Sequence, residues 1–308
     1  MRGDQLVFLL SEIYRETYRK GELLHDPSYL HLLQLHVPWS KIAQHIELLP
    51  DPVERLYLRS LENQYLGDYL ERELAKLDLN GHEALPFEKA VFYIGLLHNP
   101  LYKEENFFSR LSNWEMRIRE RMQSLAIDLQ NQKENFLHFI PLLGTHAARL
   151  RAQEIIRAIN GFLFETMGLI GEENCFYETA SHCVQSFLEQ ENLRGIPISL
   201  SAIYLILARR LGLPIYGVNM PRHFLIKWET NQLELFLDPF HGGRIIPKDA
   251  IIYLLKTNQY PLQSQFFSAC NSATIIRRML SNLSTVFQKI GWTERWALTE
   301  RLMRSLPS

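Results

Sequence analysis

The chain has 308 residues, which is enough to bury a sizeable core in one large domain or two modest ones. Its hydrophobic fraction of 46% and charged fraction of 22% are those of a folded globular protein and exclude a disordered one. The formal net charge is −1, so no basic excess indicates nucleic acid or an anionic membrane as a partner.

The cysteines and histidines do not follow the spacing of a common metal site or disulfide framework. Cys175, Cys183 and Cys270 are an odd number without CxxC spacing, and none of the eleven histidines lies in an HExxH motif. From the sequence we therefore expect no metal site and no cofactor. Nothing in it specifies the oligomeric state.

The N-terminus does not have the pattern of a signal peptide. Glu12, Arg15 and Glu16 interrupt the first helical pattern, whereas a signal peptide has an uncharged apolar stretch. The most apolar run, residues 196–208, is too short to span a bilayer. We expect a soluble, cytoplasmic protein without a membrane partner.

Residues 1–80 predict an N-terminal helical region that forms a small cap. Prolines interrupt its helical pattern, because proline removes a helix donor. Apolar side chains recur at about every third or fourth position between residues 56 and 69, which indicates a core-facing stripe. Asn80 and Gly81 have the composition of a helix C-terminus, so a domain boundary is expected there.

Residues 81–308 are expected to form a second domain. It divides into a helical part (81–170), a core helix with a sheet (171–245) and closing helices (246–308). The predicted helices of its first and last parts are 85–98, 106–138, 146–167, 274–290 and 293–306.

The core of this domain is predicted to contain an unusually apolar helix at residues 197–211. Pro197 lies in its first turn and Gly212 follows its end, which is the usual asymmetry of helix ends. A helix that is apolar on nearly all sides must be buried. Three strand-like runs follow, at 215–219, 224–229 and 233–237.

A histidine and an aspartate flank the last two of these strands. His223 begins the second strand and Asp238 closes the third. If Thr230 and Asn231 form a two-residue hairpin loop, His223 and Asp238 lie directly opposite each other on one face of the sheet, with Cβ atoms about 4.5–5.5 Å apart. The carboxylate could then fix the tautomer of the imidazole and stabilise its protonated form. The alternative is a purely structural pair.

Several motifs together resemble the SirB-type transglutaminase-like family, over roughly residues 83–308. They are Arg194-Gly-Ile-Pro-Ile-Ser-Leu-Ser-Ala-Ile-Tyr, Ala208-Arg-Arg-Leu-Gly-Leu-Pro, Gly217-Val-Asn-Met-Pro-Arg-His-Phe-Leu-Ile, Leu237-Asp-Pro-Phe-His-Gly-Gly-Arg and Arg278-Met-Leu-Ser-Asn-Leu. The resemblance implies an α+β, mostly helical, transglutaminase-like (papain-like cysteine-protease-type) core. In that fold a central helix packs on a small antiparallel sheet.

The resemblance also implies a degenerate catalytic triad. In active members a cysteine at the start of the central helix attacks a glutamine amide or peptide carbonyl, and a histidine and an aspartate complete the triad. His223 and Asp238 match the second and third positions, but Pro197 lies at the cysteine position, 15 residues before Gly212. Proline cannot be a nucleophile. The SirB-type branch usually shows this same Pro-x-Ser pattern.

Two smaller departures from the family pattern lie near the same motifs. His241 stands where the family more often has asparagine, and Ser181-His182 replaces the usual Asn-Ser. His241 is interpreted either as part of the cleft or as an exposed loop histidine.

Two functions remain open from the sequence. The first is a non-catalytic regulatory or protein-interaction role with a protein partner. The second is a hydrolase or acyltransferase on amide or peptide substrates, in which Ser199 or Cys183 is the nucleophile beside His223 and Asp238. The structural alternatives are a helix-start serine bonded to nearby backbone and a buried, inert cysteine. A third hypothesis is that residues 1–80 recruit a partner through an exposed apolar groove.

Overall fold

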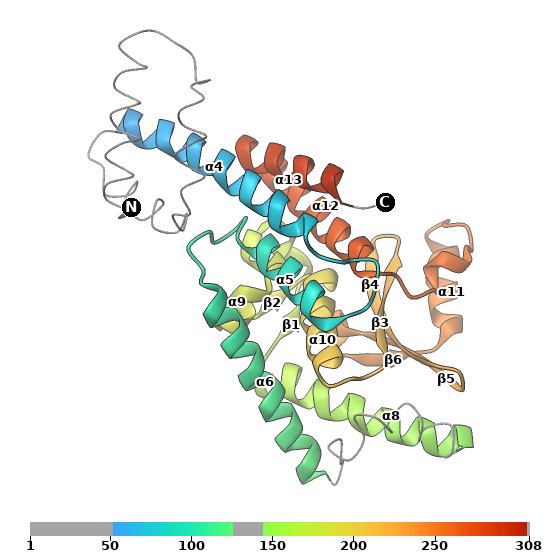
Figure 1. Cartoon of the computed structure of the whole chain (residues 1–308). Helices are drawn as coiled ribbons and strands as arrows, with labels where there is room; N and C mark the ends of the chain where they lie inside the picture. Colours follow the sequence, from blue (N-terminus) through green and yellow to red (C-terminus); the bar gives the residue numbers. More distant parts are fainter. Residues whose placement is uncertain (1–51, 126–143, 307–308) are drawn as a thin grey trace.

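The computed structural model describes residues 52–125 and 144–306. Its architecture is α+β, as predicted, with helices around one small antiparallel sheet (Figure 1). The α-helices are α4 (Pro52–Ala75), α5 (Ala84–Gly95), α6 (Glu104–Ser124), α8 (Gly144–Asn160), α9 (Val184–Leu188), α10 (Pro197–Arg210), α11 (Lys248–Thr257), α12 (Ser272–Ile290) and α13 (Thr293–Ser305). The strands are β1 (Ile170–Gly171), β2 (Arg194–Gly195), β3 (Ile215–Met220), β4 (His223–Thr230), β5 (Leu233–Asp238) and β6 (Arg244–Ile246).

Helix α10 is the buried centre of the fold. Every side chain from position 198 to 208 is buried, which confirms the interpretation of its apolar sequence. The helix packs on β3 and β4 of the sheet and is covered by α5 and α12. Pro197 occupies its first turn, and Gly212 with φ of +70° follows its end, a conformation that favours glycine. Helix and sheet thus form the predicted core.

The sheet has the order β3-β4-β5-β6, with all neighbours antiparallel. The predicted register of the β4–β5 hairpin is wrong by two residues. Thr230 pairs with Leu233, so the loop is Asn231-Gln232 and not Thr230-Asn231. The reason is local: the Thr230 hydroxyl accepts hydrogen bonds from the backbone N–H groups of Gln232 and Leu233, which makes it the residue before the turn.

This shift places His223 and Asp238 diagonally across the hairpin and not directly opposite. Because side chains alternate with a period of two, a shift of two residues leaves both on the same face of the sheet. The contact between them survives the error in register, as the site geometry below shows.

Other predicted elements differ at their ends. The helix predicted at 106–138 ends at Ser124, and residues 126–138 lie outside the described part of the chain. The helix predicted at 146–167 changes at Gly161 into a π-helical turn, η3 (Gly161–Thr166). The sequence reading did not identify α9, α11, β6 or the short parallel pair of β1 and β2.

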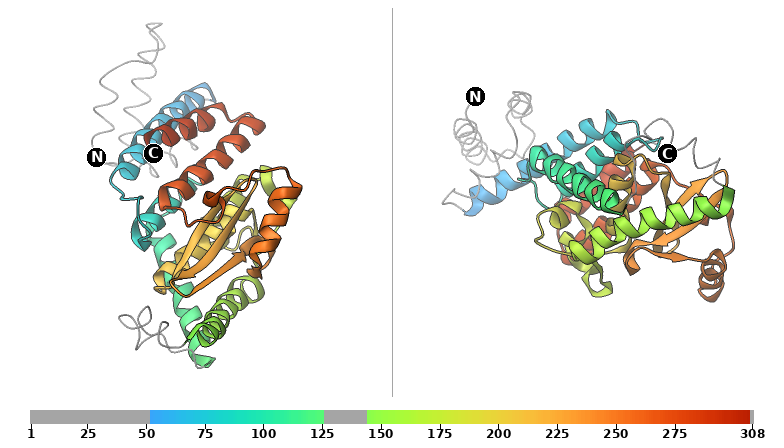
Figure 2. Two further views of the ribbon diagram at one scale, coloured as in Figure 1. Left: turned by 90° about the vertical axis from the view of Figure 1, so that its right-hand side faces the viewer. Right: turned by 90° about the horizontal axis from the view of Figure 1, so that it is seen from below.

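The described part of the N-terminal region is the single helix α4, which packs on α13 and shares the main core (Figure 2). Arg301 of α13 forms ion pairs with Asp68 and Glu71 of α4. Gly67 lies against Leu298, and a side chain at position 67 would collide with the Leu298 side chain. Glycine therefore allows α4 and α13 to pack closely. The apolar groove predicted for residues 1–80 falls mostly outside the described residues, and the boundary at Asn80-Gly81 stays a prediction. Among the described helices, none is both long and apolar enough to cross a membrane.

Candidate functional site

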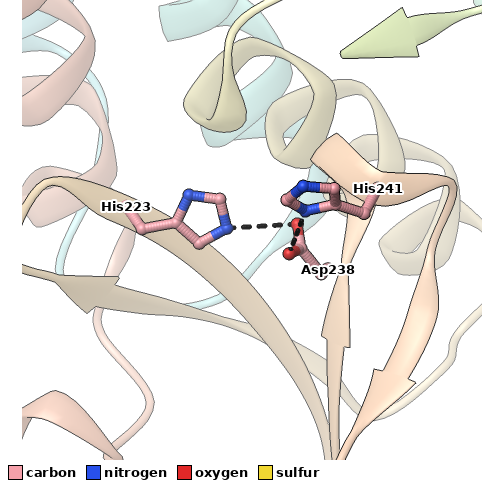
Figure 3. Close-up of side chains that lie close together, drawn as sticks. All are labelled: His223, Asp238 and His241. Atoms are coloured by element: carbon pink, nitrogen blue, oxygen red, sulfur yellow. Dashed lines mark hydrogen bonds and ion pairs between the residues drawn. The ribbon is translucent and has the colours of Figure 1, made fainter. Parts of the chain in front are cut away.

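His223 and Asp238 meet where β4 begins and β5 ends, near the start of α10. His223 begins β4 and Asp238 closes β5, and His223 Nε2 lies 3.1 Å from Asp238 Oδ1 (Figure 3). The Asp238 side chain is 3% exposed and that of His223 is 18% exposed. The backbone N–H of Phe240 also donates to Asp238 Oδ1. The structure therefore brings together the two residues that the sequence analysis paired.

His241 joins this pair from the turn that follows β5. Its Nδ1 lies 2.6 Å from Asp238 Oδ2, on the other oxygen of the carboxylate (Figure 3). A 3-10 turn, η6 (Pro239–His241), carries the ring back toward Asp238, and Gly242 with φ of +73° ends that turn. His241 is half-exposed. It is thus an exposed loop histidine that also contacts the site, so the two interpretations from the sequence apply together.

The charge of Asp238 is balanced by its neighbours. Burial alone would raise the pKa of this carboxyl group. Hydrogen bonds and charge interactions with His223 and His241 outweigh burial and hold the pKa below its ordinary value. Asp238 is therefore an ionised acceptor at neutral pH, placed between two imidazole rings.

Among the described residues, these same three side chains are the group that could supply the ligands of a metal ion. His223, Asp238 and His241 each offer one ligand atom, and these atoms lie within 4.8 Å of one another. Around tetrahedral zinc, with bonds of about 2.0–2.1 Å, neighbouring donors lie about 3.3 Å apart. The observed separations of 3.1 and 2.6 Å are those of direct hydrogen bonds. A metal ion would have to push His241 away from the carboxylate.

A cavity of about 340 Å³ opens beside His223, at the N-terminal end of α10. Its lining residues come from the 3-10 turn η4 (Glu173–Tyr177), the start of α10, the β3–β4 turn with the start of β4, and α12; they are Phe176, Ile196, Pro197, Ile198, Arg222, His223, Phe224, Arg278 and Asn282. Pro197 and His223 therefore line one cavity. We refer to it as the α10 pocket.

Ser199 and Cys183, the candidate nucleophiles, are bonded elsewhere. The Ser199 hydroxyl donates to the Ser181 carbonyl at 2.6 Å and accepts from the Ile196 N–H at 3.2 Å, so it caps the start of α10. Cys183 is buried, its Sγ lies 3.4 Å from the Thr179 carbonyl, and burial raises its pKa to about 12. Neither residue is among those that line the α10 pocket. A catalytic role for either stays a prediction.

The Ser181-His182 departure supports the wall of the pocket. The carbonyl of Ser181 is the acceptor for Ser199. His182 Nε2 lies 2.7 Å from the carbonyl of Phe176, and its ring packs edge-on against the Phe176 ring. Burial lowers the pKa of His182 to about 4, so the ring is neutral at pH 7. This histidine holds Phe176, which lines the pocket.

Arg222, Arg278 and Asn282 were quoted in the sequence motifs but were given no role there. Arg222 precedes His223, whereas Arg278 and Asn282 lie one helical turn apart on α12. Their approach to Pro197 depends on how α12 packs across α10, which no local pattern predicts. The sequence signal that could have identified these residues is their position in motifs that resemble those of a known family.

Known proteins resemble about half of the chain, including the segment that forms the candidate site. A family profile described as "Transglutaminase-like superfamily" matches residues 105–281, more than half of the chain. A UPF0162 protein of Xylella fastidiosa (strain 9a5c) is 31% identical over 160 residues, which cover 49% of this chain and 56% of that protein. F-box only protein 21 of Mus musculus is 28% identical over 153 residues, 47% of this chain and 24% of that protein. The matches thus span about half the length of the bacterial relative and about a quarter of the mammalian one. No solved structure matches the chain.

Proposed function

Because the chain belongs to the transglutaminase-like superfamily, we propose that it is a non-catalytic member whose α10 pocket binds part of a protein partner. Its role is then regulation or protein interaction. One observation carries the proposal: Pro197, at the position of the nucleophile, lies in the wall of the same cavity as His223. Proline has no thiol or hydroxyl group, so it cannot form the covalent intermediate of this chemistry. Membership of the SirB-type branch stays a prediction.

The bonds of the alternative nucleophiles also support this proposal. A nucleophilic serine needs a base within hydrogen-bond reach, yet the hydroxyl of Ser199 donates to the backbone of Ser181. A nucleophilic cysteine needs a lowered pKa, and burial raises that of Cys183. Nothing in the described site favours the hydrolase or acyltransferase hypothesis over a binding role.

The lengths of the relatives are consistent with an interaction module. The matched segment covers 56% of a bacterial UPF0162 protein but only 24% of F-box only protein 21. A segment that occurs within chains of such different length is one part of larger proteins. A binding domain can be combined in this way without depending on the rest of the chain.

An activity assay on the full chain tests the proposal. The substrates are a glutamine-containing peptide with a fluorescent primary amine, and a peptide whose cleavage releases a fluorophore. We expect no turnover above that of the His223→Ala variant. The proposal is wrong if the wild type shows turnover that His223→Ala loses. Ser199→Ala and Cys183→Ala then identify the nucleophile.

A further inference from the structure

The α10 pocket contains positive charge that its own lining does not balance. Two arginines, Arg222 and Arg278, line it, whereas no aspartate or glutamate is among its described lining residues. The N-terminal end of α10, at Pro197, adds the positive end of a helix dipole. The imidazole of the third basic residue, His223, already contacts Asp238.

Arg278 is a partly buried cation that has no carboxylate counter-ion among the described residues. Its recorded hydrogen bonds go to the Asn219 side-chain oxygen at 3.3 Å and the Met220 carbonyl at 3.4 Å, both uncharged and both long. It forms no ion pair with a carboxylate of the described residues. Burial lowers its pKa below the ordinary value. Removing an arginine from water without an opposite charge is unfavourable, so its surroundings favour an anion.

The β3–β4 turn holds Arg222 in the lining of the α10 pocket. Met220 pairs with His223, so Pro221 and Arg222 form a two-residue turn, with proline first and a residue of positive φ second. Arg222 has φ of +58°, where glycine would be favoured. Among the described residues, its side chain has no hydrogen bond or ion pair. Its guanidinium group is therefore available to a ligand.

The remaining lining determines which anion fits. Five apolar side chains form the walls; they are Phe176, Ile196, Pro197, Ile198 and Phe224. Two guanidinium groups and the Asn282 amide match the two oxygens of one carboxylate. A phosphate has three strong acceptor oxygens and commonly uses backbone N–H groups at a helix start, where Pro197 has none.

We propose that the α10 pocket binds a carboxylate group of a peptide, held between Arg222 and Arg278, with its apolar stem against Pro197 and Phe224. This inference rests on the proposed function, since it names the group that the pocket would bind. The carboxylate comes either from a peptide C-terminus or from an acidic side chain, and the experiment separates these two sources.

Ligand-observed NMR titration of the full chain tests the inference. The probes are N-acetylphenylalanine for a C-terminus, N-acetylglutamate α-amide for a side chain, N-acetylphenylalaninamide as the uncharged control, and inorganic phosphate. We expect saturable binding of a carboxylate probe, with affinity at least tenfold higher than that of the amide, because a charged acceptor is lost in the amide. Whichever carboxylate binds more tightly identifies the source.

Variants connect the binding to the two arginines. Arg222→Gln and Arg278→Gln should each weaken the carboxylate probe about tenfold or more. The matched control is Arg149→Gln, the same charge change at an exposed position of α8. Arg222→Gln keeps the test decisive if Arg278→Gln does not fold, because Arg222 has no recorded partner among the described residues.

Four results overturn the inference: equal binding of the amide, unchanged affinity in both pocket variants, binding of phosphate but of neither carboxylate, or no binding of any carboxylate probe. These results are independent of the activity assay. Turnover of a peptide would contradict the non-catalytic role without touching carboxylate binding. Failure of every carboxylate probe at millimolar concentration would remove the inference and leave the non-catalytic role standing.

Discussion

The arginines near the two ends of α10 differ in their partners: Arg210 at the C-terminal end is paired with carboxylates, whereas the two arginines that line the α10 pocket have no carboxylate partner among the described residues. At the C-terminal end, Arg210 makes two hydrogen bonds to the buried Glu88, at 2.8 and 2.6 Å, and a third contact to Glu115. At the N-terminal end, Arg222 and Arg278 line a cavity without any carboxylate among its described lining. The comparison separates arginines that hold the fold from arginines that remain available to a ligand.

The C-terminal end fits the general electrostatics of helices. Cations at the end of a helix interact favourably with its dipole, and a bidentate arginine–carboxylate pair adds direction. The neighbouring Arg209 lies over the ring of Phe87 at 4.2 Å and donates to Ser272. At the N-terminal end the dipole opposes nearby cations, so Arg222 and Arg278 are not there because α10 stabilises them. This contrast is the reason to assign them to a ligand.

The largest expected effect is on the paired end. Glu88→Gln keeps the shape of the side chain but leaves Arg210 without its main partner, so we expect a loss of about 3–5 kcal/mol in the free energy of unfolding. Urea unfolding followed by circular dichroism measures it. Arg278→Gln should cost far less, because it removes a partly buried cation that has no counter-ion in the described part of the chain. Equal losses in the two variants would show that the ends of α10 do not differ as described.

The second prediction concerns the charge that the fold balances beside the pocket. Asp238→Ala removes a buried carboxylate that accepts from His223, His241 and the Phe240 N–H. We expect the free energy of unfolding to fall by about 1.5–3 kcal/mol at pH 7. A drop below 0.5 kcal/mol would mean that the carboxylate contributes little to the fold.

The pH dependence of this loss has a defined sign. The pKa of Asp238 is lowered in the folded protein, so its stabilisation is fully present above its unfolded pKa. It is lost as the pH falls through the still lower folded pKa. The difference between wild type and Asp238→Ala should therefore shrink below about pH 4. A difference that grows on acidification would contradict the lowered pKa.

Added Zn²⁺ that stabilises the wild type but not His241→Ala would identify His223, Asp238 and His241 as a metal site.

How far the sequence could predict the site depends on which contacts are local. The burial of α10 followed from its composition, because a helix that is apolar all round has only one place in a fold. The contact of His223 with Asp238 followed from a short hairpin, even though the Thr230 hydroxyl shifted the register by two residues. By contrast, His241 depends on a 3-10 turn, and Arg278 depends on how α12 packs across α10. Such contacts between distant elements carry no periodic signal in the sequence.

The third prediction introduces a thiol at the pocket end of α10. Pro197→Cys places a thiol at the N-terminus of α10, in the same cavity as His223. The helix dipole and a neighbouring imidazole both favour a thiolate, so we expect the pKa of this thiol to fall at least one unit, or about 1.4 kcal/mol, below that of a free cysteine. The pH dependence of iodoacetamide labelling, located by mass spectrometry, measures this pKa.

The native cysteines and a second variant provide the controls for this thiol. Cys183 is buried and Cys175 is buried, so both should label slowly. Adding His223→Ala to Pro197→Cys should slow the labelling at pH 7 and return the thiol pKa toward its ordinary value. If the two variants label at the same rate, Pro197 and His223 do not share the geometry of a nucleophile and its base.

The smallest expected effect distinguishes the serine that caps α10 from a catalytic one. Ser199→Ala removes the acceptor of the Ile196 N–H and the donor to the Ser181 carbonyl, so it should lower the free energy of unfolding by about 1–2 kcal/mol. Binding of the carboxylate probe should stay within twofold of the wild type, because Ser199 does not line the pocket. Ser199→Thr keeps a hydroxyl group and is the matched control for stability. Loss of probe binding in a folded Ser199→Ala protein would instead place this hydroxyl in the binding site. The two arginines would then not be sufficient to explain how the α10 pocket binds a carboxylate.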